Sequence, residues 1–243
     1  MLTFLSLILP FIFAGDRRLD PFQFNLCVWD LEGIDPRYTL LLLKDEDKRD
    51  EEEKKISEIM YSSLSTCDMF VLPGLRNHTT AKNLVKHMED HSFMDFVPYP
   101  LEGRYDSTIL SRIDLDHTSD IVNKTKFPIK DSKCNYTGSG EALSDMSFYG
   151  TLHFHDPVPT THVFSVRLKS NQTAYDCAYR EAQAQQICDI VKTFPKGDHV
   201  YIAGSFEANP DDPYHQVMEK CGLYDTWNLA PKNSYSRKDT KTG

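Results

Sequence analysis

The sequence contains only one long apolar run, and it lacks an excess of positive charge. Beyond residues 1–15, no stretch is apolar enough over enough residues to span a bilayer. The 27 Lys and Arg residues are outnumbered by 36 Asp and Glu, which gives a formal charge of -9. This balance disfavours a general nucleic-acid coat or a protein that covers anionic membranes. An acidic enzyme can still cleave phosphodiesters at a locally positive site, so charge alone leaves the partner open.

Internal repeats at a short fixed period are also missing, and the rest of the composition is ordinary. The chain has 243 residues, of which 40% are hydrophobic and 26% are charged. A chain of this size and composition favours one well-buried domain, which we place at residues 22–243.

Residues 1–15, MLTFLSLILPFIFAG, have the pattern of a secretory signal peptide. The run is short for a membrane span and ends in small residues, so we expect cleavage near Ala14 or Gly15, although no positive charge precedes it. The alternatives are an uncleaved anchor and a buried first strand. Four Asn-X-Thr sequons also indicate a glycosylating compartment; they lie at Asn77, Asn123, Asn135 and Asn171. We therefore expect a secreted, extracellular glycoprotein without a transmembrane domain after cleavage.

The six cysteines have spacings that match no zinc ribbon or finger, so disulfides are their expected use in an oxidising compartment. The sequence leaves the pairing open. Cys188 and Cys221 would pair if they lie on neighbouring helices. Cys27, on an expected core strand, is equally compatible with a buried free thiol.

Apolar runs and turn signals predict a mixture of strands and helices. Strands are expected at residues 22–31, 68–72, 93–98, 106–113, 146–154, 160–168 and 199–203. Helices are expected at residues 45–64, 80–90, 175–194 and from about 211. The strands at 146–154 and 160–168 should form a hairpin.

Two polar stretches are expected at the surface. Residues 45–55, DEDKRDEEEKK, predict a frayed, solvated helix start rather than an acidic interaction tail. Residues 114–145 are rich in turn formers and predict a long surface excursion. In the helix at 175–194, one side is expected to face inward; it carries Tyr179, Ala182, Gln186 or Ile187, Ile190 and Val191.

The most informative stretch is residues 199–218, HVYIAGSFEANPDDPYHQVM. A β-rich run ends at a Gly204 break, a Pro/Asp turn follows, and a helix begins near Asp211. Loops at strand ends often carry the chemistry of α/β proteins. Ser205 and Glu207 are therefore candidate functional residues.

Five short motifs, in order along the chain, resemble those of the endonuclease/exonuclease/phosphatase superfamily, which has the DNase I-like fold. A first strand ending in Trp-Asn is matched by LCVWDLEG, and "DIIALQE" by DMFVLPG. "VAILSR" is matched by STILSR, and a strand ending in "NTHL" by FSVRLKS, with Arg180 and Gln183 on the next helix. "AGDFNANPDDP" is matched by AGSFEANPDDP. The matched segments are residues 26–33, 68–74, 107–112, 164–170 and 203–213.

The resemblance implies an α/β protein, specifically a two-sheet, mostly antiparallel four-layer α/β sandwich. Its site would lie at one rim, where strand ends converge. The closing Asp-His pair of the family is absent before Gly243. The resemblance therefore leaves two alternatives open: a domain that lacks its last strands, or a truncated sequence.

Active members of the family use a divalent cation, usually Mg²⁺, together with a carboxylate that activates water and a histidine at the phosphoryl group. This sequence departs from the pattern at every mapped position. The Glu of "LQE" is Gly74, which offers no ligand, and the His of "NTHL" is Arg167, which can hold a phosphate but cannot usefully donate a proton. The Asp of "GDFN" is Ser205, a weak base, and its neighbouring Asn is Glu207. The first-strand Asn is Asp30.

We therefore expect a pseudoenzyme with a binding or interaction role and no cofactor. Losing positioned acid–base groups costs about 10²–10⁴ in rate, and losing the metal costs several kcal/mol more. One alternative is a divergent phosphoesterase that uses Mg²⁺ or another divalent cation on a nucleic acid, phosphoinositide, sphingolipid or other phosphate ester. A structural, glycosylated surface protein is the other.

Further candidates concern ligands. Arg112, Arg167 and Lys169 are candidates to hold a phosphate-bearing ligand, although the partner could equally be a protein. Asp30 and Glu207 are candidates for a relocated cation site, with simple drift as the alternative. A metal site near residues 153–156, at His153, His155 and Asp156, lacks an evident further ligand. Arg180 and Gln183 are expected to tie the long helix to a strand end.

Overall fold

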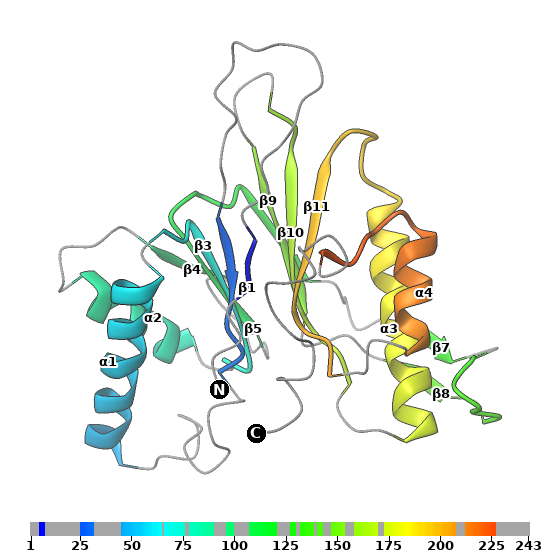
Figure 1. Cartoon of the computed structure of the whole chain (residues 1–243), viewed down its shortest axis with the longest axis horizontal. Helices are drawn as coiled ribbons and strands as arrows, with labels where there is room; N and C mark the ends of the chain where they lie inside the picture. The colour runs from blue at the N-terminus through cyan, green and yellow to red at the C-terminus, as the bar shows by residue number, and fades with distance from the viewer. Residues whose placement is uncertain are drawn as a thin grey trace, which may run out of the picture. The chain divides into compact units, whose positions relative to one another are not determined.

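The computed structural model describes most of the chain between residues 25 and 226. The described segments are residues 5–7, 25–31, 45–64, 66–75, 78–89, 96–99, 107–120, 127–129, 132–138, 140–142, 147–153, 158–169, 173–207 and 212–226. The chain divides into two compact units, residues 2–115 and residues 116–243. Each unit contains a β-sheet with helices packed on it (Figure 1). No helix within the described segments is long and apolar enough to cross a membrane.

The first unit has a sheet with the strand order β1-β2-β3-β5-β4, in which β2 and β3 are parallel and the other pairs antiparallel. Its elements are β1 (Leu5–Leu7), β2 (Leu26–Val28), α1 (Glu46–Ser63), β3 (Met69–Pro73), α2 (His78–Glu89), β4 (Val97–Tyr99) and β5 (Ser107–Ser111). Helices α1 and α2 lie side by side, and Met60 and Leu84 pack with Phe70 of β3. Met69 and Val71, which point to the other face of β3, are fully buried too.

The first strand involves part of the expected leader. The backbone of Leu5–Leu7 pairs antiparallel with β2, as the alternative of a first strand predicts. This pairing belongs to the uncleaved chain, so removal of residues 1–15 stays a prediction.

Helix α1 is formed from Glu46 onward, so the prediction of a frayed start is wrong. The Asp45 side chain caps the helix by accepting a hydrogen bond from the backbone nitrogen of Lys48 at 3.4 Å. Glu46 and Asp47 in the first turn interact favourably with the helix dipole. The run is also not solvated throughout, because Glu53 is only 1% exposed.

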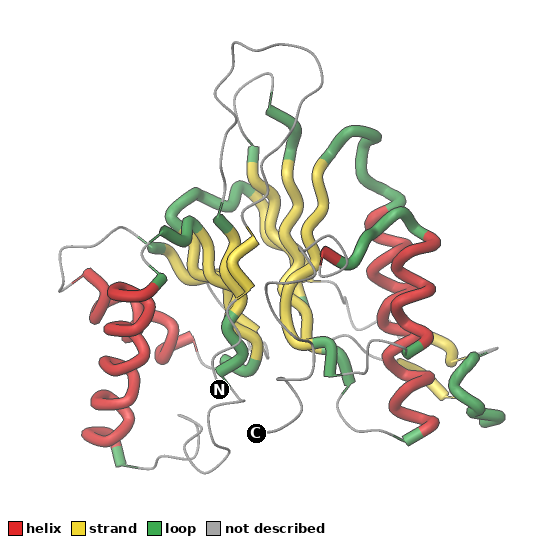
Figure 2. The backbone as a smooth tube through the Cα atoms, viewed as in Figure 1, coloured by secondary structure: helices red, strands yellow, loops and turns green. Residues whose placement is uncertain are grey.

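The second unit has a sheet with the order β11-β10-β9-β6 and a separate two-stranded ribbon, β7-β8. Its elements are β6 (His117–Asp120), β7 (Phe127–Ile129), β8 (Gly140–Ala142), β9 (Phe148–Leu152), β10 (Thr161–Arg167), α3 (Ala174–Val191), β11 (His199–Ser205) and α4 (Pro213–Lys220). Strands β10 and β11 are parallel, and the remaining pairs of this unit are antiparallel. Helices α3 and α4 run side by side (Figure 2), and Ile187 and Met218 pack with Phe164 of β10.

The expected surface excursion at residues 114–145 is wrong in its described parts. Strand β6 joins the sheet through β9, and β7 pairs with β8. Ile129 and Cys134 are buried and pack with Ala178 of α3. These short strands are stabilised by tertiary pairing, which their composition does not predict.

The strand before the site is longer than expected, because β11 does not break at Gly204 but continues to Ser205. Gly204 has φ 143°, and a Cβ atom there would lie 1.9 Å from the carbonyl oxygen of Val166 on β10. Glycine is therefore required for the close approach of the two strands.

All six cysteines form disulfides, Cys27–Cys67, Cys134–Cys177 and Cys188–Cys221. The third links α3 to the end of α4, as expected if these helices are neighbours. The alternative of a free thiol at Cys27 is wrong.

Candidate functional site

Among the described strands, each unit has one parallel pair, and most of the mapped residues lie at its carboxyl end. In the first unit, Asp30 follows β2 and Gly74 follows β3. The two segments stay paired beyond the strands, since the nitrogen of Leu31 donates to the oxygen of Pro73 at 3.2 Å. Gly74 has φ 85°, a conformation that strains any residue with a side chain. A glutamate at this position would therefore need a different backbone.

Arg112 lies at the end of β5 in the same unit and supports the local structure. Its Nη2 donates to the carbonyl oxygen of Cys67 at 2.6 Å, and its guanidinium lies 5.2 Å from the centre of the Phe96 ring. Burial lowers the pKa of Arg112, and the nearby Asp68 carboxylate opposes this shift. These contacts hold the turn that leads into β3.

In the second unit, Arg167 ends β10 and Ser205 ends β11, and the two residues are direct partners in the parallel ladder. The loop that follows β11 brings Glu207 to both. Ser205 Oγ donates to Glu207 Oε1 at 3.1 Å, and Arg167 Nη2 lies 3.9 Å from the same oxygen. The side chains of this ion pair are only 12% and 29% exposed.

The chemistry of this Arg167–Ser205–Glu207 cluster differs from that of a metal site. The Glu207 carboxylate has an internal cation and an internal hydroxyl donor as neighbours. Glu207 also has φ 49°, a conformation uncommon for residues other than glycine. The backbone thus holds the carboxylate toward the strand ends.

Arg180 of α3, which is only 1% exposed, connects this helix to the end of β10 and to the residue before α4. Its Nη2 donates to Asp212 Oδ2 at 2.8 Å, and its Nη1 donates to the carbonyl oxygen of Lys169 at 2.8 Å. Gln183 Oε1 accepts a hydrogen bond from the Lys169 nitrogen at 2.9 Å. The predicted structural role of Arg180 and Gln183 is confirmed. The same contacts correct the expected inward face of α3, which is partly polar and includes both residues.

The three predicted phosphate-binding cations do not all lie in one unit. Arg167 and Lys169 belong to the second unit and Arg112 to the first. The Lys169 ammonium lies 5.9 Å from the centre of the Tyr179 ring, within the range of a cation–π contact. Asp30 and Glu207, the candidates for a relocated cation site, also belong to different units, so that site stays a prediction.

The sequence did not single out His162, which lies at the opposite end of β10 from Arg167. His162 Nε2 is 2.9 Å from Asp198 Oδ2, and its Nδ1 is 3.1 Å from Thr151 Oγ1. Threonine, histidine and carboxylate are the residue types of a nucleophilic triad. However, Thr151 is buried and the imidazole stacks on Phe194 at 3.7 Å. The chain of contacts therefore connects strands and offers no nucleophile to a substrate.

The proposed ligand group around His153 is described only in part. His153 is exposed, with Nδ1 3.3 Å from Thr160 Oγ1. His155 and Asp156 lie outside the described residues. Trp29 is buried in the core of the first unit.

No protein-family model matches the sequence, and no curated protein matches it either. Solved structures do match the three-dimensional arrangement. A double mutant of beta toxin from Staphylococcus aureus with bound magnesium ions has a TM-score of 0.54 at 14% identity, over 82% of this chain and 70% of the toxin. SmcL gives 0.57 at 13% identity, over 87% and 72% of the two chains. TDP2 from D. rerio, in complex with a single-strand DNA product, gives 0.51 at 14% identity, over 86% and 70%. This chain therefore has the DNase I-like fold.

Proposed function

We propose that this protein is a secreted pseudoenzyme, which keeps the DNase I-like fold and uses it for binding rather than for hydrolysis. One observation carries the proposal: the carboxylate of Glu207 lies against Arg167 and Ser205 at the end of the β10–β11 pair. An arginine in this place neutralises the carboxylate and cannot serve as a general acid at neutral pH. Among the described residues, the Ser205 hydroxyl donates to this paired carboxylate.

The described residues do not fit a bound Mg²⁺ at these strand ends. Mg²⁺ requires several hard oxygen ligands in near-octahedral geometry. In the first unit, position 74 supplies no side chain and has a backbone conformation that disfavours one. In the second unit, the Glu207 carboxylate already has an ion-pair partner. We therefore derive no catalytic step from a metal at this position.

The test is a hydrolysis assay with the purified chain, in Mg²⁺, Mn²⁺ or Ca²⁺, against DNA, RNA and a generic phosphodiester. An active nuclease of the same fold serves as the positive control. We expect no turnover above background. Metal-dependent turnover that disappears in both Asp30→Ala and Glu207→Ala would overturn the proposal and favour a divergent phosphoesterase.

A phosphate-bearing ligand is the binding partner favoured by the positions of Arg167 and Lys169, two residues apart at the end of β10. Inorganic phosphate should raise the melting temperature, and Arg167→Ala should remove this rise. Lys192→Ala is the matched control, because Lys192 is exposed on α3 and pairs only with Asp189 among the interactions described. If phosphate changes the melting temperature equally in the unmodified chain, Arg167→Ala and Lys192→Ala, the result would favour a structural surface protein or a protein partner.

Secretion is supported by the three disulfides, which are typical of oxidising compartments. Asn135, the sequon within the described residues, is exposed. When the protein is expressed in cells with a secretory pathway, it should be recovered from the culture medium, and its first residue should follow position 14 or 15. Its mass should decrease when N-glycans are removed enzymatically. Retention of residues 1–15 on the purified protein would contradict the signal peptide.

A further inference from the structure

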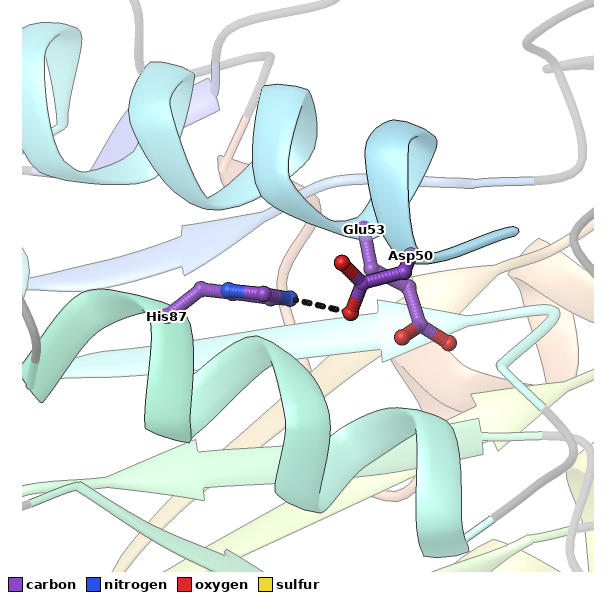
Figure 3. A group of neighbouring side chains, drawn as sticks. All are labelled: Asp50, Glu53 and His87. Carbon is purple, nitrogen blue, oxygen red and sulfur yellow. Dashed lines mark hydrogen bonds and ion pairs between the residues drawn. The ribbon is translucent and has the colours of Figure 1, made fainter. Parts of the chain in front are cut away.

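A group of metal-ligating side chains lies far along the sequence from the strand-end motifs, between α1 and α2 of the first unit. Asp50 and Glu53 are three residues apart on α1 and therefore share one face of the helix. His87 reaches them from α2 (Figure 3). One ligand atom from each residue lies within 4.8 Å of the other two. His87 Nε2 is 3.1 Å from Asp50 Oδ1.

Glu53 is the unusual member of this group. It is 1% exposed, although it belongs to the highly charged segment of α1. Its Oε2 accepts a hydrogen bond from Asn83 Nδ2 at 2.8 Å, but its Oε1 is buried and has no hydrogen-bond partner among the described residues. Burying a carboxylate oxygen without a donor or a cation is costly. The pair formed by His87 and Asp50 does not supply that partner.

We propose that Asp50, Glu53 and His87 form a site for a divalent transition-metal cation, with Zn²⁺ as the best match. One imidazole nitrogen and two carboxylate oxygens form a typical zinc ligand set, whereas Mg²⁺ and Ca²⁺ prefer oxygen ligands alone. Water completes the coordination, because the Asp50 side chain is 67% exposed and leaves the site open to solvent. The cation links α1 to α2.

The distances are compatible with this assignment after a small adjustment. Three atoms that all lie within 4.8 Å of one another have a common centre that is at most about 2.8 Å from each of them, and zinc bonds to nitrogen and oxygen are about 2.0–2.2 Å long. Each ligand atom therefore moves inward by no more than about 0.8 Å, a shift within the range of side-chain rotation. Asn83 orients Glu53 by holding Oε2, as residues around a metal site commonly do.

Titration of the metal-free full chain with Zn²⁺, followed by calorimetry, should show one bound ion. Asp50→Asn, Glu53→Gln and His87→Gln should each weaken binding at least about tenfold. Glu58→Gln, on an exposed face of α1, makes the same chemical change as Glu53→Gln elsewhere on the helix and should leave binding intact. Asn83→Ala keeps all three ligands and should still weaken binding about 10–100-fold.

Replacing Zn²⁺ with Co²⁺ gives an independent readout, because a His-ligated cobalt site has a visible absorption band that His87→Gln should remove. The proposal fails if no ion binds, or if binding persists in both Asp50→Asn and His87→Gln. It also fails if Glu207→Ala, rather than these variants, abolishes binding, because the ion would then lie at the strand ends. Asp50 is exposed, so Asp50→Asn tests the site without a risk to folding.

Discussion

The ion pair between Arg180 and Asp212 should contribute far more to stability than the surface pairs of the same helix. The Arg180 side chain is 1% exposed and that of Asp212 is 17% exposed, with Nη2 and Oδ2 2.8 Å apart. Asp212→Asn keeps the shape of the side chain but leaves a buried guanidinium without its counterion. Removing one partner of a buried pair costs about 3–5 kcal/mol in the free energy of unfolding. Asp212 precedes α4 but its side chain makes no capping hydrogen bond, so the substitution removes no cap.

The assay is a double-mutant cycle with Arg180→Met and Asp212→Asn, read by chemical denaturation. The matched control is the pair of Asp189 and Lys192 on α3, at 3.1 Å but 53% and 58% exposed. We expect a coupling energy above about 2 kcal/mol for the buried pair and about 0.2–1 kcal/mol for the exposed pair. For a chain of this size, the loss in Asp212→Asn corresponds to a melting temperature lower by about 6–20 °C. Equal coupling energies in the two cycles would refute the reasoning, because burial would then make no difference.

Three further predictions concern the second unit. Gly204→Ala should lower the free energy of unfolding by about 3 kcal/mol or more in chemical denaturation, because the new Cβ would clash with a backbone oxygen at 1.9 Å. The control is Gly197→Ala, which has φ 108° but open space around it and should cost about 1–2 kcal/mol. Equal costs for the two substitutions would contradict the clash. Replacing both Cys188 and Cys221 with Ala opens a loop with a sequence separation of 33 and should cost about 4 kcal/mol, whereas an unchanged unfolding midpoint would show that the disulfide does not restrain the unfolded chain. Burial raises the pKa of Tyr201 to about 12, so the folded chain retains a proton that the unfolded chain loses near pH 10; stability should be complete below about pH 10 and fall as the pH rises to about 12. Tyr201→Phe should flatten that fall in pH-dependent denaturation, and an identical pH profile would count against the shift.

Much of the fold could be predicted from the sequence, because its core strands are strongly apolar and end at clear turn signals. The segment at residues 68–72 was expected as a strand and is found as β3 (Met69–Pro73). Strands β7 and β8 could not be predicted in the same way, since the segments FPI and GEA are short and weakly patterned. Their structure depends on pairing with each other, which is a tertiary property.

The candidate site was predictable as a set of positions but not as a set of contacts. Motif spacing placed Arg167 and Ser205 at strand ends, where the structure has them as ladder partners. The contact of both with Glu207 depends on strand register and on the positive φ of Glu207. Neither feature can be read from residue types. The burial of Glu53 was not predicted, because its neighbours in the sequence are charged and this pattern indicates a solvated helix face.

The disulfide between Cys27 and Cys67 has a consequence for proteolysis. The loop that it closes includes α1, which contains four potential cleavage sites for trypsin-like proteases. They are Lys48, Arg49, Lys54 and Lys55. A cut at any of these positions leaves both fragments covalently joined. Protein cut once in this loop should therefore migrate as an intact chain on a denaturing gel without reductant. It should separate into two fragments only after the disulfide is reduced.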